Sequence, residues 1–118
     1  MPSAVANAGV AHLSGGGYDH NWITRGFGPG LRSVATLRDP KSGRGLHLRS
    51  TEPGVHVYTG GYISERMIGK GNHPYPAYSG LTFETQKFPD SPNFSHFPTA
   101  RLNPGEVYRH EMEYSFFA

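Results

Sequence analysis

The pattern of apolar and polar residues predicts short β-strands and no long helix. Residues 33–39 and 45–51 both alternate, and Leu46 and Leu48 share one face of the second segment. The residues between them, 39–43, have the sequence DPKSG, in which proline fixes φ and glycine permits a positive φ. The two alternating segments and this turn predict a β-hairpin.

Three further segments alternate in the same way. Residues 55–58 place two valines on one face and His56 on the other, and residues 107–117 form the clearest strand of the chain. Residues 81–86 predict a strand that sends its apolar residues to a core and places Glu84 on the opposite, polar face. A strand glutamate is most often a solvated residue, but a carboxylate held on a rigid strand can also act as a general base.

The remaining segments predict turns and loops. Residues 60–78 are rich in Gly, Pro and Asn, and loops of that length usually either carry function or are flexible. Residues 88–93 are expected to be irregular, and residues 103–106 (NPGE) predict a turn. Residues 1–16 are mostly small and have no period, so we expect a flexible lead-in followed by a single folded portion, residues 17–118.

The composition agrees with a folded, loop-rich, all-β protein. The 118 residues include 16 Gly and 10 Pro, well above the usual combined share of about 12%, and both residue types disfavour long helices. Aromatic residues make up 13% of the chain and the net charge is only +2. The chain therefore has rings for a core and little self-repulsion.

Charge and motif patterns argue against several classes of function. Lys and Arg are scattered rather than gathered in a basic stripe, so no nucleic-acid partner is expected. No segment has the length of a membrane span and no secretory signal is recognisable, so we expect no membrane partner and a cytoplasmic location. The chain has no Cys and its seven His lack ligand spacing, so no metal site is predicted.

The segment at residues 18–22 (YDHNW) gathers polar groups and rings around Asp19. One interpretation is an Asx-type turn in which the Asp19 carboxylate accepts hydrogen bonds from nearby backbone. The other is a carbohydrate contact, in which the carboxylate accepts hydrogen bonds from sugar hydroxyls while a ring covers the apolar face of the sugar. The residues alone favour the turn.

Five motifs follow one another in a fixed order along the chain. They are residues 17–21 (GYDHN), 51–60 (TEPGVHVYTG), 69–71 (GKG), 83–93 (FETQKFPDSPN) and 103–108 (NPGEVY). Together they resemble the C-terminal portion of the aldose 1-epimerase (galactose mutarotase) family, over roughly residue 17 to the C-terminus. The fold that the resemblance implies is all-β, the C-terminal part of the galactose-mutarotase-like β-supersandwich.

The resemblance implies an isomerase that interconverts the α and β anomers of free aldohexoses, such as galactose or glucose, without cofactor or metal. In the family, a glutamate removes the proton of the anomeric hydroxyl while a histidine protonates the ring oxygen. By this resemblance Glu84 is the general base and Asp19 hydrogen-bonds sugar hydroxyls. His56 stands where the family usually carries a sugar-contacting Gln.

Three of the family's site residues have no counterpart that the sequence identifies. They are the proton-donating histidine, and a second histidine and an arginine that hold the sugar. We therefore expect weak or absent epimerase activity from this chain alone, unless another chain supplies those residues. The alternatives are a non-catalytic carbohydrate-binding or interaction module, and a truncated gene product. Open sheet edges also predict self-association, or a partner chain that covers them.

Overall fold

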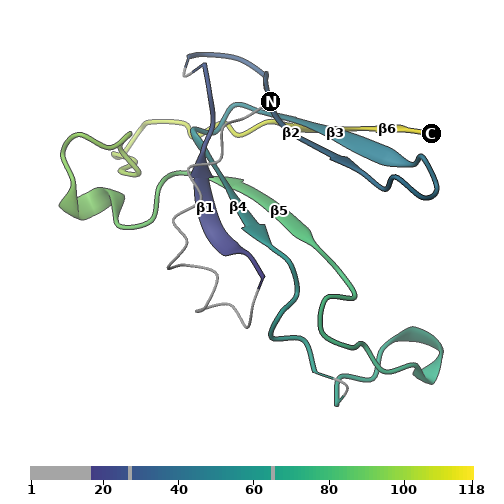
Figure 1. The fold of residues 1–118 in the computed structure, drawn as a ribbon. Coiled ribbons are helices and arrows are strands. Elements are labelled where there is room, and N and C mark those ends of the chain that lie inside the picture. Colours follow the sequence, from purple (N-terminus) through teal and green to yellow (C-terminus); the bar gives the residue numbers. More distant parts are fainter. Residues whose placement is uncertain (1–16, 27, 65) are drawn as a thin grey trace. The chain divides into compact units, whose positions relative to one another are not determined.

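The computed structural model describes residues 17–26, 28–64 and 66–118, and Figure 1 shows the path of the chain. Its strands are β1 (Asp19–Ile23), β2 (Arg32–Arg38), β3 (Gly45–Ser50), β4 (Gly54–Tyr58), β5 (Thr82–Gln86) and β6 (Met112–Phe117), with 3-10 turns η1 (Lys70–Asn72) and η2 (Ser91–Asn93). Within these residues no helix is long and apolar enough to cross a membrane. The all-β prediction is confirmed, and the lead-in predicted for residues 1–16 lies outside the described residues.

The described chain divides into two compact units. The first contains residues 17–22 and His56–Glu84, and the second contains Ile23–Val55 and Thr85–Ala118. Strands β2, β3 and β6 belong wholly to the second unit and form one antiparallel sheet. Strands β1, β4 and β5 form the other sheet, and each of them crosses the division between the units.

Strand β4 is the central strand of the sheet β1-β4-β5. At one end of the β1–β4 pair the Thr59 amide donates to the Tyr18 carbonyl at 2.9 Å, and at the other end the Thr24 amide donates to the Pro53 carbonyl at 2.9 Å. Residue numbers rise along β1 while those of the partners fall along β4, so the pair is antiparallel. The turn favoured for residues 18–22 is therefore wrong, because this segment is a strand paired with β4.

The hairpin predicted from the alternation is confirmed by β2 and β3. Leu37 lies opposite Leu46 in an antiparallel register, with one irregularity near the start of β2. Strand β6 pairs with the other edge of β3 and places Phe116 opposite Leu46 and Tyr114 opposite Leu48. Because side chains alternate between the two faces, these five residues make one face of the sheet apolar.

The turn of this hairpin is held by one carboxylate. Asp39 accepts hydrogen bonds from the Lys41 amide at 3.0 Å, from the Ser42 amide at 3.1 Å and from the Ser42 hydroxyl at 2.5 Å. The Ser42 hydroxyl, followed by the Lys41 amide, holds the pKa of the Asp39 carboxyl below its usual value. Gly43 closes the turn with a φ of 78°, a left-handed conformation that strains other residues.

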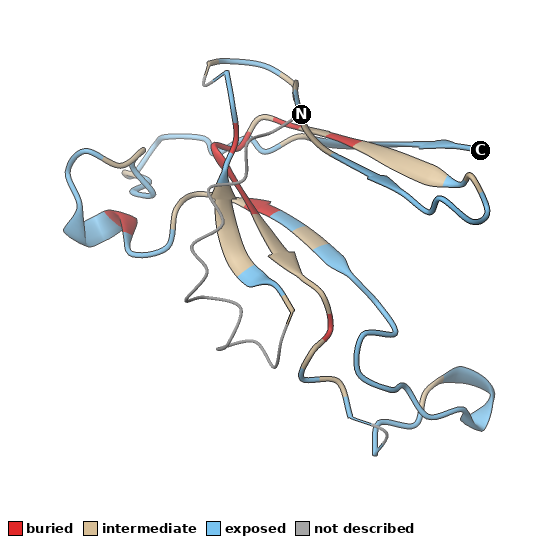
Figure 2. Cartoon of the chain, in the orientation of Figure 1, coloured by how far each residue is buried: buried red, intermediate tan, exposed pale blue. Residues whose placement is uncertain are grey.

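Few hydrophobic side chains are buried in the described residues. Leu48 is 0% exposed and Val55 is 4% exposed. In Figure 2 the colour of buried residues is concentrated at residues 52–55, where the chain enters β4. Phe116 on the apolar face of β2-β3-β6 is 79% exposed, so much of the apolar surface of this sheet is uncovered.

The most buried charged side chain in the second unit is Glu52, which is 1% exposed. Its carboxylate accepts a hydrogen bond from the Tyr108 hydroxyl at 2.7 Å and pairs with Lys87 Nζ at 3.3 Å. Desolvation of the phenol, its hydrogen bond to Glu52 and the charge of Glu52 raise the pKa of Tyr108 to about 12. The Arg32 guanidinium donates to the backbone carbonyls of Glu52 and Thr51 at 2.7 and 3.3 Å. These contacts fix the segment just before β4.

The strand predicted over residues 107–117 begins only at Met112. The Thr51 amide donates to the Glu111 carbonyl at 3.2 Å, and this is the end of the ladder with β3. Before that point the side chains find other partners, because His110 bonds the Thr85 hydroxyl at 2.7 Å and Tyr108 bonds Glu52. The first half of the alternating run is therefore not a strand.

Two smaller expectations also differ from the structure. Residues Ser91–Asn93 form the single 3-10 turn η2 inside the segment expected to be irregular. Leu81, expected in the core, precedes β5 and is 39% exposed. The turn at residues 103–106 is confirmed, because the Glu106 carboxylate accepts from the Asn103 amide at 2.8 Å.

Candidate functional site

The three predicted site residues lie on three neighbouring strands of one sheet. Asp19 is on β1, His56 is on the central strand β4, and Glu84 is on β5. All three belong to the first compact unit. The antiparallel pairing of β1 with β4 brings together residues that are 37 positions apart in the sequence.

Asp19 and His56 are in direct contact. Asp19 Oδ1 lies 2.7 Å from His56 Nε2, and the two side chains are 38% and 24% exposed. An ionised carboxylate only accepts hydrogen bonds, so Nε2 is the protonated nitrogen in this pair. The contact fixes the plane and the tautomer of the imidazole while leaving the pair accessible to a solute.

The aromatic rings next to Asp19 in the sequence do not lie on the same face of the strand as its carboxylate. Tyr18 makes edge contacts with the rings of His20, at 6.3 Å, and Trp22, at 5.6 Å between ring centroids. Successive side chains of a strand point to opposite faces, so these rings lie on the face away from Asp19. The aromatic cover expected beside the carboxylate is not provided by them.

A different aromatic pair accompanies His56. Tyr58 lies two residues further along β4 and therefore shares the face of His56. Its ring stacks on that of Tyr62, with centroids 6.4 Å apart and an interplanar angle of 16°. The Tyr58 hydroxyl also accepts a hydrogen bond from the Tyr62 amide at 2.8 Å, and Tyr62 is 58% exposed. This pair gives the site an exposed aromatic surface.

Glu84 faces away from the buried residues of its strand. Thr85 is 7% exposed and Val55 is 4% exposed, so both lie on the covered face of the sheet. Glu84 adjoins Thr85 and His56 adjoins Val55, so alternation places Glu84 and His56 together on the opposite face. The Thr82 hydroxyl donates to Glu84 Oε1 at 2.9 Å and orients the carboxylate.

Sequence reasoning missed Thr82 and the Tyr58–Tyr62 pair. The signal for Thr82 was present, because a residue two positions before Glu84 in a strand shares its face. The signal for Tyr62 was absent, because it lies outside the strands in the loop that follows β4. Only the folded loop shows that its ring returns to the strand.

The histidines do not gather into a metal site within the part of the chain that the structure describes. There, no group of three or more His, Asp or Glu side chains is arranged to hold a metal ion. His47 bonds the hydroxyls of Ser33 and Thr36 at 3.2 and 2.9 Å, and His110 bonds Thr85. His12 lies outside the described residues.

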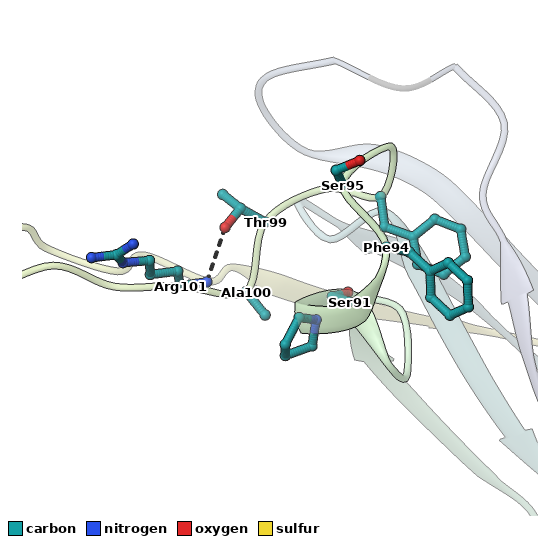
Figure 3. A pocket seen from close by; sticks show the side chains of 8 residues that line it. Ser91, Phe94, Ser95, Thr99, Ala100 and Arg101 are labelled. Atoms are coloured by element: carbon teal, nitrogen blue, oxygen red, sulfur yellow. Dashed lines mark hydrogen bonds between the residues drawn. The ribbon is translucent and has the colours of Figure 1, made fainter.

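A separate hollow lies in the second unit, around η2 (Figure 3). Figure 3 shows the Arg101 side chain extending away from Phe94, and the Thr99 hydroxyl accepting from the Arg101 amide at 3.1 Å. The residues labelled around it are Ser91, Phe94, Ser95, Thr99, Ala100 and Arg101. None of the predicted site residues lines this hollow.

Comparison with known proteins agrees with the resemblance seen in the motifs. The family model described as aldose 1-epimerase matches residues 4–115. The chain is 40% identical over 100 residues to galactose mutarotase from Bos taurus, covering 85% of the chain and 29% of that relative. It is 32% identical over 104 residues to aldose 1-epimerase from Escherichia coli (strain K12), covering 86% of the chain and 30% of that relative.

The chain spans about 30% of the length of the curated relatives that it matches. A solved structure, that of a GalM/aldose epimerase homologue from C. elegans, is similar with a TM-score of 0.73 and 29% sequence identity. The alignment covers 85% of this chain and 30% of that one. The similarity confirms the predicted fold class.

Proposed function

Because this chain belongs to the aldose 1-epimerase family, we propose that it takes part in the interconversion of the α and β anomers of free aldohexoses, such as galactose or glucose. The reaction opens a cyclic hemiacetal and recloses it on either face of the aldehyde. It requires that the hydroxyl on C1 lose a proton, so the site must hold a base near that hydroxyl.

In this proposal Glu84 is the base. Its carboxylate lies on the exposed face of the sheet, and one of its oxygens accepts a hydrogen bond from the Thr82 hydroxyl at 2.9 Å. The other oxygen remains to accept the proton of the C1 hydroxyl. Asp19 and His56 hydrogen-bond the sugar from the two neighbouring strands. No metal or cofactor takes part in the proposed reaction.

The observation that carries the proposal is the arrangement of the three side chains. The Asp19–His56 contact of 2.7 Å joins β1 to β4, and Glu84 follows on β5, the next strand of the same sheet. A carboxylate base beside a fixed polar pair, with an exposed aromatic ring nearby, suits a small polyhydroxylated ring.

The test is the relaxation of optical rotation after α-galactose is dissolved in buffer with the purified protein. We expect relaxation only slightly faster than in buffer alone, because the family's proton-donating histidine has no identified counterpart in this chain, and the loss of this acceleration in Glu84→Gln. Glu113→Gln is the matched control, because Glu113 is another strand glutamate, 45% exposed and outside the proposed site. Acceleration that survives in Glu84→Gln would overturn the assignment of the base.

A second candidate function is non-catalytic carbohydrate binding. The Tyr58–Tyr62 stack favours it, because an exposed ring beside hydrogen-bonding side chains is sufficient to hold a sugar without chemistry. Calorimetric titration with galactose and glucose separates the two functions. Binding that Asp19→Ala abolishes, without any acceleration of mutarotation, would support this candidate against the first.

We also propose that another polypeptide surface covers the apolar face of β2-β3-β6, supplied by a second copy or by a partner chain. Leu37 and Tyr114 on this face are each 40% exposed and Phe116 is 79% exposed. Contiguous apolar patches of this kind usually mark interaction sites. The oligomeric state in solution tests this proposal.

A further inference from the structure

Strand β6 forms one edge of the sheet β2-β3-β6. On one side it is paired with β3 along its whole length, and no strand pairs with its other side in the part of the chain that the structure describes. All six of its residues are exposed, and none is Pro or Gly. An edge strand of this kind offers backbone N–H and C=O groups to a further strand.

The other edge of the same sheet is less suited to pairing. In β2 the register shifts between Ser33 and Ala35, and the strand ends at the exposed Arg38. Register irregularities and charged side chains are the usual features that keep an edge strand from pairing with another chain. The register of β6 against β3 runs without a shift from Met112 to Phe117. Strand β6 is therefore the edge of this sheet at which a strand can be added.

We propose that β6 pairs antiparallel with β6 of a second copy of this chain, about a two-fold axis that passes through Tyr114. Residues opposite each other in an antiparallel pair lie on the same face of the sheet, so an axis normal to the sheet must pass through a residue and not between two. In the proposed register Met112 lies opposite Phe116 of the second copy. Glu113 lies opposite Ser115 of the second copy.

The side chains of β6 favour this register over its neighbours. It places apolar Met112 against apolar Phe116, and the Glu113 carboxylate against the Ser115 hydroxyl. An axis through Glu113 would place two glutamates opposite each other, and like charges directly opposite are destabilising. An axis through Ser115 would place Glu113 against Phe117, and one through Phe116 would place Ser115 against Phe117. Only the axis through Tyr114 matches every opposed pair in polarity.

The charge of Glu113 does not oppose this pairing. Its carboxylate is paired with the Arg49 guanidinium at 3.0 Å, on the neighbouring strand β3 of the same chain. The negative charge at the edge is therefore balanced within each copy. The Ser115 hydroxyl of the second copy can donate a hydrogen bond to the same carboxylate, because a carboxylate accepts several hydrogen bonds at once.

Two chains joined in this way form a closed assembly. Each contributes a three-stranded sheet, so the joined sheet has about six strands, a common number in proteins. A two-fold interface uses the same surface of both chains, so β6 is covered in both copies and only the β2 edges remain. Association should therefore stop at a dimer, in which the apolar faces of the two sheets become continuous.

Disulfide cross-linking tests the register, because the chain has no Cys of its own. Chains that carry Glu113→Cys or Ser115→Cys are mixed and then oxidised with copper phenanthroline. Directly opposite Cβ atoms lie about 4.5–5.5 Å apart and diagonal ones about 7–8 Å apart, while a disulfide needs roughly 3.5–4.5 Å. We expect a covalent dimer in the mixture and none with either variant alone.

Arg38→Cys is the matched control, because Arg38 is an exposed residue on the opposite edge of the same sheet. It should give no covalent dimer, alone or mixed with either variant. In reducing buffer both β6 variants should sediment as dimers like wild type, which checks that they fold. The Glu113–Arg49 pair that one of them loses is exposed and contributes little to stability.

Sedimentation of wild type separates this proposal from the covering of the apolar face. A wild-type dimer, with cross-linking confined to the mixture, supports the pairing of β6. If wild type associates but the mixture does not cross-link, or if Ser115→Cys cross-links alone, pairing about Tyr114 is overturned and the covering of the apolar face stands. A wild type that stays monomeric at high concentration overturns both proposals.

Discussion

Side chains alternate between the two faces in both sheets, but the faces compared here differ in chemistry. On β1-β4-β5, the face away from Val55 carries Asp19, His56 and Glu84, and two of these side chains are fixed by a contact of 2.7 Å. On β2-β3-β6, the face that includes Leu46 and Phe116 is apolar and partly uncovered, from Leu48 at 0% exposure to Phe116 at 79%. One sheet carries hydrogen-bonding side chains on its exposed face, and the other carries apolar side chains.

The two regions are held in place by different interactions. In β2-β3-β6 the ladder itself is extensive, with β3 paired along its whole length on both edges. The segment that leads into β4 depends instead on the buried Glu52 carboxylate and its contacts with Tyr108 and Lys87. Loss of a paired, buried charged group is costly. Removal of one side chain should therefore lower the free energy of unfolding much more in the segment before β4 than in β2-β3-β6.

The largest expected effect comes from Glu52→Ala. Removal of this carboxylate leaves the Tyr108 hydroxyl without its acceptor and Lys87 without its ion-pair partner. We expect the free energy of unfolding to fall by about 1–3 kcal/mol, the usual cost of leaving hydrogen-bonding groups unsatisfied, because Lys87 is 32% exposed and partly hydrated. Urea unfolding followed by circular dichroism measures the change.

Glu113→Ala is the matched control for this experiment. Glu113 also pairs with a basic side chain, Arg49, at 3.0 Å, but the two are 45% and 40% exposed. Exposed pairs contribute about 0–1 kcal/mol, so little change is expected. Equal effects of the two substitutions would contradict the contrast between the buried carboxylate of Glu52 and the exposed one of Glu113.

The apolar face of β2-β3-β6 is tested by Phe116→Asp. We expect wild type to sediment as an associated species, or with a bound partner chain, and the variant to shift strongly toward the monomer. Ser115→Asp places the same charge one residue away, on the opposite face of β6, where Ser115 lies opposite His47. A wild type that is monomeric at high concentration, or equal effects of both variants, would contradict a docking role for the apolar face.

A smaller effect concerns pH and the Tyr108 hydroxyl. Its pKa is raised from 10.0 to about 12 in the folded chain, so the unfolded chain loses this proton first as the pH rises. The stability contributed by Tyr108 is therefore fully present below pH 10 and is lost between pH 10 and 12. Tyr108→Phe should flatten the decline of the urea midpoint over this range. An unchanged decline would show that Tyr108 does not titrate as described.

Local features were the ones that the sequence predicted correctly. The hairpin of β2 and β3 follows from the alternation and from its turn, in which Asp39 accepts a backbone hydrogen bond and Gly43 adopts a positive φ. Strand β1 could not be predicted in this way. Its polar residues have the composition of a turn, and only the pairing with β4, through Tyr18 and Thr59, makes the segment extended.

The sequence singled out three candidate residues that the fold brings onto one sheet, but it did not predict the contacts between them. The motifs singled out Asp19, His56 and Glu84, but the hydrogen bond between the first two depends on the register of β1 against β4. Register is a long-range property that alternation within one strand does not define. For the same reason the alternation before Met112 was overinterpreted, because Tyr108 and His110 bond other groups instead of extending the strand.

The most direct test of the central claim is the initial rate of change of optical rotation of freshly dissolved α-galactose, measured with wild type and with Glu84→Gln. We expect a rate only slightly above buffer for wild type alone, because three of the family's site residues have no identified counterpart in this chain, and the buffer rate for Glu84→Gln. We expect the wild-type rate for Glu113→Gln. A Glu84→Gln protein that accelerates mutarotation as well as wild type would contradict the assignment of Glu84 as the base.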